Sequence, residues 1–257
     1  MAPFDLQRPE KLSDALALLD SDGARPFSGG TALMLMMKAG VLRPSRLVSL
    51  DRLELAAIKI ENQNLQVGAM TRLSDLERSP EVRRGWPVIA RTLKTLSNVR
   101  VRNVATVGGA LAHADPHMDL PPLLSALGAR VKVTGKVGER MIPVEDLYAG
   151  YLETTLRKGE LITQVEVPAL NQRRAAYLKC TTRSADDWPA VGVAVVIGDE
   201  TRIFVSAVTD RPTRIADEAA IGRLKIEGDL HGSAAYKKQL LRVYLKRAID
   251  EARNARH

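Results

Sequence analysis

Apolar positions recur along the chain with two different spacings, and the change from one to the other divides the sequence. Over residues 10–20 they fall at helical spacing, which predicts an amphipathic helix. An extended segment around Phe27 leads into a second predicted helix that reaches Lys38, and residues 47–50 are predicted to be a strand. This order predicts a small α/β unit over about residues 1–55.

From residue 56 apolar and polar positions alternate, as they do in strands of a half-buried sheet. The alternation predicts a hairpin that turns at residues 62–64, a second hairpin between residues 131 and 142, and a strand over 162–167. Helices are predicted over 72–78, from 80 to 96 with an interruption before Pro87, and over 122–127. Residues 56–168 are therefore expected to form a mixed or antiparallel sheet with helices.

Three further β-like runs follow Pro168, and two helical stretches come after them. The strands are predicted at 175–180, 191–197 and 202–208, and the helices at 213–224 and 232–254. Strands followed by helices indicate a separate unit, with residues 169–173 as the linker. The predicted fold class is α+β, with a two-part first domain over 1–168, divided at about residue 55, and a small C-terminal domain over 174–257.

The composition, 45% hydrophobic and 26% charged, is that of a globular protein. No apolar run approaches the roughly 20 residues of a transmembrane helix, so no membrane span is expected. No signal peptide is expected either, because charged residues between Asp5 and Lys11 occupy the place of its apolar segment. The single cysteine, Cys180, excludes an intrachain disulfide, a CxxC zinc site and an iron–sulfur cluster held by this chain alone. A cytoplasmic location is the expectation.

The net charge is +8, and the last 22 residues, from Tyr236 to His257, carry +5 of it. A basic terminal helix can indicate a nucleic acid, an anionic membrane or an acidic protein partner, and a solvated helix face is the alternative. That helix also carries an expected apolar stripe of Tyr236, Leu240, Val243, Tyr244 and Leu245. The chain has ten aromatic residues, too few and too scattered for the stacking surfaces of single-strand binders. Packing or assembly is therefore expected of this helix, and no nucleic-acid partner is expected.

The candidate chemistry begins with two glycine pairs. No two of the 18 glycines are separated by one residue, so a GxGxxG fingerprint is absent. The sequence instead contains Ser28-Gly29-Gly30-Thr31 and Thr106-Val107-Gly108-Gly109. Paired glycines allow close backbone approach and expose N–H groups to an anion, so that two such turns brought together suit a pyrophosphate. Plain turn formation is the alternative.

A second candidate is the alternation of His113, Asp115, His117 and Asp119, which in an extended strand would point four metal-binding side chains to one face. It opens the alternative of a metal-dependent hydrolase. Pro116 interrupts the strand, however, and neither an HExxH nor a GxSxG motif accompanies it.

The residues from Thr106 to Pro116, TVGGALAHADP, followed by Asp119-Leu120-Pro121, resemble the TIGGNLAHADP…DLP signature of one flavoprotein family. The family is that of the FAD-binding (medium) subunits of molybdenum hydroxylases, which include aerobic carbon monoxide dehydrogenases and xanthine dehydrogenases. Residues 28–33, SGGTAL, are similar to the AGG(T/Q)xL loop of that family. Further matching segments are 67–71, 101–103, 159–162 and 232–236, so the similarity covers nearly the whole chain in order.

The resemblance implies FAD as the cofactor and no catalytic or metal-binding residue in this chain. Backbone amides of the two glycine turns would hold the pyrophosphate, and Asp119 would accept hydrogen bonds from FAD hydroxyls or, alternatively, only cap a helix. Ile162 and Lys179 would lie near the flavin ring, and Trp188 would lie beside the isoalloxazine or in the C-terminal core. The expected cofactor-binding residues are Ser28, Gly29, Gly30, Thr31, Ala32, Leu33, Thr106, Val107, Gly108, Gly109, Ala110, His113, Asp115, Asp119, Ile162, Lys179 and Trp188.

Two departures from the family pattern bear on the flavin. Ala110 replaces the usual Asn, and Trp188-Pro189 is bulkier than the usual aromatic-Ala pair. The resemblance also implies partners: a large molybdenum-binding subunit with molybdopterin, a small iron–sulfur subunit with two [2Fe–2S] clusters, and an external electron acceptor, in a dimer of heterotrimers. The alternative is a stand-alone flavin- or nucleotide-binding protein without redox partners.

Overall fold

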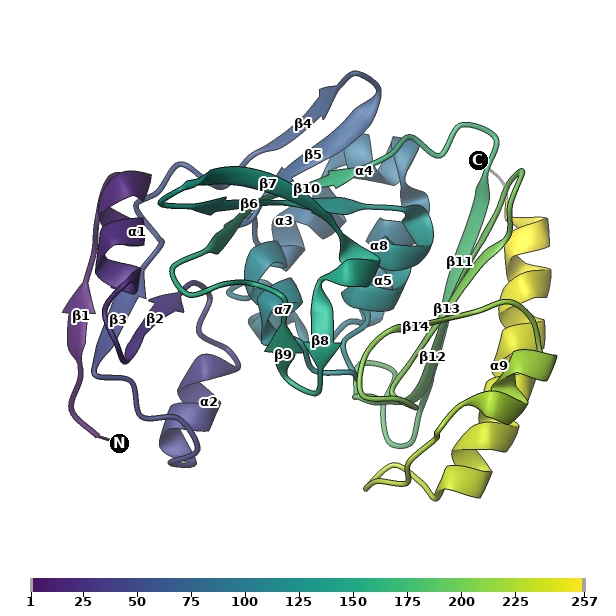
Figure 1. Ribbon diagram of the computed structural model, residues 1–257. Helices are drawn as coiled ribbons and strands as arrows, with labels where there is room; N and C mark the ends of the chain where they lie inside the picture. Colours follow the sequence, from purple (N-terminus) through teal and green to yellow (C-terminus); the bar gives the residue numbers. More distant parts are fainter. Residues whose placement is uncertain (1, 256–257) are drawn as a thin grey trace.

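The computed structural model of the chain describes residues 2–255, which form three larger sheets in chain order and a fourth sheet of only two short strands (Figure 1). The first sheet is parallel, with the strand order β1-β3-β2. Its elements are β1 (Asp5–Gln7), α1 (Leu12–Leu19), β2 (Ala24–Phe27), α2 (Leu33–Lys38) and β3 (Arg46–Ser49). Helix α1 buries Ala15, Leu16 and Leu19, the face expected from its apolar spacing. The predicted α/β unit is confirmed.

The second sheet is antiparallel throughout, with the order β4-β5-β10-β6-β7. Its strands are β4 (Ile58–Glu61), β5 (Asn64–Gly68), β6 (Arg130–Gly135), β7 (Gly138–Pro143) and β10 (Leu161–Val167). Both predicted hairpins are present. The first turns at Asn62 and Gln63, whose positive φ angles of 49° and 66° match a two-residue turn of the kind that fits strand twist.

Helices accompany this second sheet: α3 (Leu73–Arg78), α4 (Pro80–Gly85), α5 (Pro87–Thr95), α6 (Val99–Arg102), α7 (Val107–His113) and α8 (Leu120–Leu127). In Figure 1, α3, α5, α7 and α8 lie on the lower side of the sheet. A short 3-10 turn (Val144–Asp146) and the ribbon of β8 (Tyr148–Gly150) and β9 (Glu153–Thr154) follow β7. Pro80 and Pro87 each occupy the start of a helix, where a missing N–H costs nothing, so the interrupted helix is confirmed.

The third sheet, β11-β12-β13-β14, has helices on both faces. Its elements are β11 (Arg174–Thr181), β12 (Pro189–Ile197), β13 (Arg202–Ser206), β14 (Thr213–Ile215), a 3-10 turn (Ala219–Arg223) and α9 (Ala234–Asn254). Ala194, Val196 and Phe204 join the central core beside α8, whereas Val193 and Val195 join the core under α9. Strand β12 is almost entirely apolar because both of its faces are covered.

Two predictions for the C-terminal part are wrong in detail. The helix predicted at 213–224 begins as strand β14, because Thr213 and Ile215 pair with β13, and only a short 3-10 turn follows.

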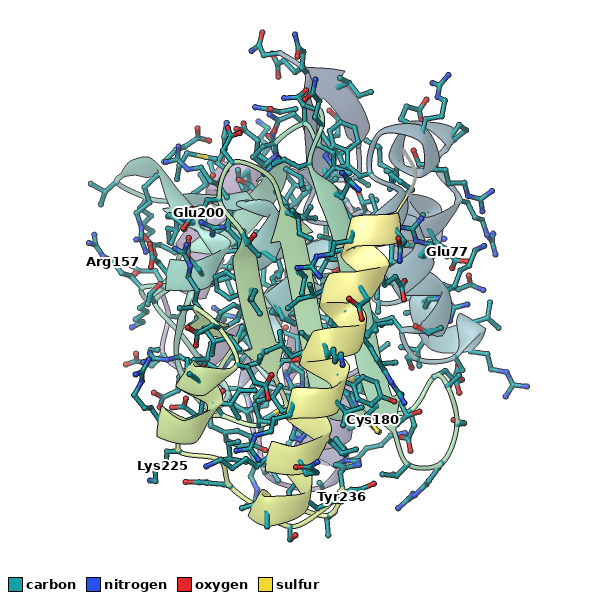
Figure 2. All side chains as sticks on the ribbon, turned by 90° about the vertical axis from the view of Figure 1, so that its right-hand side faces the viewer. Glu77, Arg157, Cys180, Glu200, Lys225 and Tyr236 are labelled. Carbon is teal, nitrogen blue, oxygen red and sulfur yellow. The ribbon has the colours of Figure 1, made fainter. Side chains whose placement is uncertain are left out.

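The second prediction concerns the apolar stripe of the last helix. Helix α9 lies across the sheet, with Tyr236 at its N-terminal end (Figure 2). Its buried face is Lys237, Leu241, Leu245, Ala248 and Ala252, while Tyr236 and Val243 of the expected stripe are exposed.

The α+β class is thus confirmed, while the exact domain boundaries stay predictions. Among residues 2–255, none of the helices combines the length and the apolar character needed to cross a membrane.

Candidate functional site

The fold packs the first glycine turn against the second turn and against the backbone directly before it, although about 75 residues separate them in the chain. A β-carbon added to Gly29 would lie 2.2 Å from the carbonyl oxygen of Val104 and 2.8 Å from Cα of Ala105. A β-carbon on Gly109 would lie 2.7 Å from Oγ of Ser28. The glycines therefore permit an approach that any side chain would prevent.

The first turn presents a row of free backbone donors. Within residues 2–255, the N–H groups from Ser28 to Leu33 donate no hydrogen bond to another protein group. All six residues are partly exposed, so these donors can reach a ligand. Gly30 has a φ of +72°, which favours glycine, and a β-carbon added there would lie 2.6 Å from the ring of Phe27. Unpaired N–H groups of this kind, at the start of α2, suit an anion.

The second turn is built differently, because its amides serve the fold. Thr106 is the N-cap of α7 and accepts a hydrogen bond from Gly109 N–H at 3.1 Å. The N–H groups of Val107 and Gly108 donate to the carbonyl oxygens of Thr71 and Ala69, at 3.0 and 2.8 Å. The expectation that these three amides face a ligand is therefore revised: this turn supports the first one. Ala110 is buried inside α7.

Asp119 forms a buried polar cluster with two residues of β11. Its carboxylate accepts hydrogen bonds from the Tyr177 hydroxyl at 2.6 Å and from Lys179 Nζ at 3.0 Å. Burial raises the pKa of Asp119, and the charge of Lys179 and the two hydrogen bonds oppose that rise. Asp119 occupies the N-cap position of α8, but its side chain makes no capping hydrogen bond, so the alternative of a simple cap is wrong.

Lys179 also fixes the segment that leads to Trp188. Its ammonium donates to the carbonyl oxygens of Thr95 and Asp187, at 2.8 and 3.1 Å, in addition to Asp119. Trp188 itself is 43% exposed, so the alternative of a core tryptophan is wrong. Ile162 lies buried in β10, paired with Val133 in the central sheet.

The alternating His and Asp residues do not converge as a metal site would require. Asp119 is paired with β11, whereas Asp115 accepts hydrogen bonds from the backbone N–H and Nδ1 of His117. Nε2 of His117 pairs instead with Asp229, near α9. His113, partly exposed at the end of α7, has a pKa lowered by burial. In the described part of the chain, no group of three or more His, Cys, Asp or Glu residues is arranged to hold a metal ion.

Sequence reasoning missed three residues that the structure places in these clusters: Tyr177, Asp229 and Lys237. Tyr177 could have been predicted from the sequence. It precedes Lys179 by two positions on a predicted strand, and side chains two positions apart on a strand lie on the same face. Asp229 and Lys237 gave no such signal, although they pair with each other, because no regular element was predicted for the segment that carries Asp229 and its other partner, His117, lies 112 residues away.

Apposed glycine turns and a row of N–H groups without a protein acceptor are features that suit a phosphorylated cofactor. Residues 2–170 match the family described as the FAD binding domain in molybdopterin dehydrogenase. The chain therefore belongs to this family of FAD-binding molybdenum hydroxylase subunits, which are oxidoreductases, and the resemblance found in the sequence is confirmed.

Two medium-chain relatives match along nearly their whole length. The chain is 31% identical over 276 aligned positions to the glyceraldehyde dehydrogenase medium chain of Sulfolobus acidocaldarius, covering 96% of this chain and 98% of the relative. It is 30% identical over 277 positions to the carbon monoxide dehydrogenase medium chain of Hydrogenophaga pseudoflava, covering 97% and 96%.

Solved structures agree with these sequence relationships. A carbon monoxide dehydrogenase structure from Hydrogenophaga pseudoflava, which lacks the Mo-pyranopterin moiety, matches with a TM-score of 0.92 and 31% identity over 98% of both chains. Quinoline 2-oxidoreductase from Pseudomonas putida matches with a TM-score of 0.89 and 27% identity, over 98% of this chain and 97% of that one.

Proposed function

We propose that this chain is the electron-transfer subunit of a multi-subunit molybdenum hydroxylase. It takes electrons from [2Fe–2S] clusters of a small partner subunit and delivers them to an external acceptor such as NAD, a quinone or oxygen. A large partner subunit carries the molybdopterin cofactor and oxidises the substrate. The medium-chain names of the relatives support this division of labour. The lone cysteine supports the same division, because this chain cannot supply four thiolates to a cluster, and it suits a cytoplasmic complex.

The observation that carries the proposal is the row of six free N–H groups from Ser28 to Leu33. These donors would hold the FAD pyrophosphate, while the second turn, held by Thr71 and Ala69, would keep the first in place. Bound FAD would supply an isoalloxazine ring that exchanges electrons with the partners. The chain's own residues need only bind, orient and shield that ring.

The side chains expected near the ring differ in how they are held. Ile162 is fixed in the central sheet, and Lys179 is fixed by Asp119 and two carbonyl groups. Asp119 retains acceptor capacity for an FAD hydroxyl, because each carboxylate oxygen can accept two hydrogen bonds. Trp188, which is half-exposed, would cover one part of the ring.

The test is FAD binding by the purified full chain. We expect a flavin absorption spectrum after incubation with FAD and gel filtration, with about one FAD per chain. FMN should not be retained comparably, because it lacks the pyrophosphate that the six N–H groups would hold. A chain that is folded by circular dichroism and yet retains no FAD would contradict the proposal.

A second test concerns the partners. The chain, co-expressed with a molybdenum subunit and an iron–sulfur subunit from the same organism, should co-purify with both, and mass photometry should show a dimer of heterotrimers. A stand-alone flavoprotein would instead bind FAD and elute without either partner. That outcome would leave FAD binding intact and refute the electron-transfer role.

Replacing Trp188 with alanine should change the flavin signal and have only a modest effect on stability. Because the indole is 43% exposed and contacts the ring of His117, we expect the free energy of unfolding to fall by about 1 kcal/mol, well below the about 3–5 kcal/mol of a core tryptophan. Flavin fluorescence should change, and reoxidation by oxygen should be faster, with FAD content unaltered. Tyr151→Ala, at another exposed aromatic, is the matched control. An unaltered flavin signal would place Trp188 away from the ring.

A further inference from the structure

His117 lies between two carboxylates from different parts of the chain. It belongs to the loop between α7 and α8, and its Nδ1 is 3.0 Å from Oδ1 of Asp115 in the same loop. Its Nε2 is 2.9 Å from Oδ2 of Asp229, in the segment before α9. A neutral imidazole carries one N–H group and can donate to only one of the two carboxylates. Donation to both requires the doubly protonated ring.

The electrostatics favour that protonated form. Burial of the ring lowers the pKa of His117, but hydrogen bonds to Asp115 and Asp229 and their charges outweigh burial, so that the pKa is raised. Asp229 is ionised under all ordinary conditions: hydrogen bonds from Lys237 and His117 outweigh the effect of burial and lower its pKa to about 2. Lys237, almost wholly buried in α9, donates to Asp229 and to the carbonyl oxygen of Ala207 at 2.8 Å.

Three further groups face this cluster. The ring of Trp188 lies with its centroid 5.7 Å from that of His117, at an interplanar angle of 56°. The ring of His231 lies 5.5 Å away on the segment that carries Asp229. His113, at the end of α7, is the remaining titratable neighbour, and its charge interacts with Asp115. The two rings form a tilted aromatic contact, and the ring of His117, held at both nitrogens, gives the indole of Trp188 a fixed surface to pack against.

The cluster also joins two parts of the fold. The backbone N–H of Ala207, just after β13, donates to the carbonyl oxygen of Pro116 at 2.8 Å. The loop of residues 115–117 is thus tied to the C-terminal domain through its backbone and through His117. From this arrangement we propose that His117 is a positioning residue: its imidazolium fixes the indole of Trp188 and joins the loop after α7 to the segment before α9.

The direct test is a pH titration of indole emission in the full chain. The chain has two tryptophans, and Trp86 is 3% exposed, so the difference between wild type and Trp188→Phe isolates the emission of Trp188. A protonated imidazole in contact quenches an indole more strongly than a neutral one. We expect the Trp188 emission to increase as pH rises, with a midpoint above the value of about 6.5 for an ordinary histidine.

Variants identify the group that titrates. His117→Gln should abolish the transition, whereas His231→Gln, the matched control, should preserve it. Asp229→Asn should lower the midpoint by about 1–3 pH units, because it removes one of the two opposite charges. A transition that survives His117→Gln, or a midpoint below 6.5 in the wild type, would overturn the proposal. An NMR titration of the wild-type histidine rings measures the same pKa and needs no variant to fold.

Thermal stability provides a second readout with a defined sign. A histidine whose pKa is raised on folding stabilises the fold fully below its unfolded pKa, and this contribution is lost as pH rises through the folded pKa. Wild type should therefore have a higher Tm than His117→Gln near pH 6, and the difference should shrink with rising pH. A constant difference would indicate a role in packing alone and would overturn the proposal.

The consequence for the flavin rests on the proposed function. With FAD bound, His117→Gln should keep its FAD content but lose the pH dependence that His117 imposes on flavin fluorescence. If the wild-type chain does not bind FAD, the proposed function fails. The indole titration, which needs no FAD, still decides the role of His117.

Discussion

Replacing Gly29 with alanine is expected to abolish FAD retention and to destabilise the protein. The added β-carbon would lie 2.2 Å from the carbonyl oxygen of Val104, and a backbone atom cannot rotate away as a side chain can. Overpacking of this kind costs about 1–3 kcal/mol, which corresponds to a loss of several degrees in Tm. Separation of the two turns would also move the six free N–H groups out of register with a pyrophosphate.

A graded series of alanine variants tests this explanation. Gly109→Ala should have a smaller effect than Gly29→Ala, because its β-carbon would meet the hydroxyl of Ser28, which can rotate. Gly85→Ala is the control, since its added β-carbon would meet no atom within 4 Å beyond its chain neighbours and its own helix backbone. FAD content after gel filtration and Tm are the measurements. Wild-type FAD content in Gly29→Ala would refute the role given to the contact between the turns.

The second large effect is expected at Asp119. Asp119→Ala would leave the ammonium of Lys179, whose side chain is only 7% exposed, without its carboxylate partner. Breaking a buried ion pair from one side costs about 3–5 kcal/mol, because the remaining charge stays buried and unpaired. The free energy of unfolding, measured by urea denaturation, should fall by that amount.

A double-mutant cycle distinguishes the pair from simple loss of packing. Asp119→Asn together with Lys179→Met removes both charges and keeps similar side-chain volumes. We expect this double variant to be less destabilised than the sum of the two single variants, by about 0.5–3 kcal/mol. Strict additivity would show that the two residues do not act as a pair. Asp5→Asn, at an exposed ion pair with Arg46, is the matched control and should change stability by less than 1 kcal/mol.

Much of the fold could be predicted because the signals were local. Alternation between residues 58 and 67, with Asn62 and Gln63 between the strands, identifies a hairpin without any knowledge of the rest of the chain. The segment at 213–215 could not be predicted, since it becomes a strand only because β13 offers it a free edge. Tertiary pairing overrode its helical spacing.

The candidate site shows the same limit. The two glycine pairs were visible, and so was their suitability for an anion. Which turn keeps its N–H groups free depends on the carbonyl oxygens of Ala69 and Thr71, and nothing in the sequence pairs these with residues 107 and 108. Likewise, the exposure of Trp188 depends on how Lys179 holds the carbonyl of Asp187. Hydrogen bonds between distant segments decided both points.

The two covered faces of β12 have a consequence for how the protein loses its structure. Val193 and Val195 belong to one core, Ala194 and Val196 to the other, and the same backbone carries all four. Neither core can be exposed to water without pulling that strand away from the other. Residues 2–170 and the C-terminal sheet should therefore melt in a single cooperative transition by calorimetry. A shortened chain that ends at residue 170 would leave the apolar surface of α8 uncovered and should aggregate, so the C-terminal unit of this chain should not be detachable.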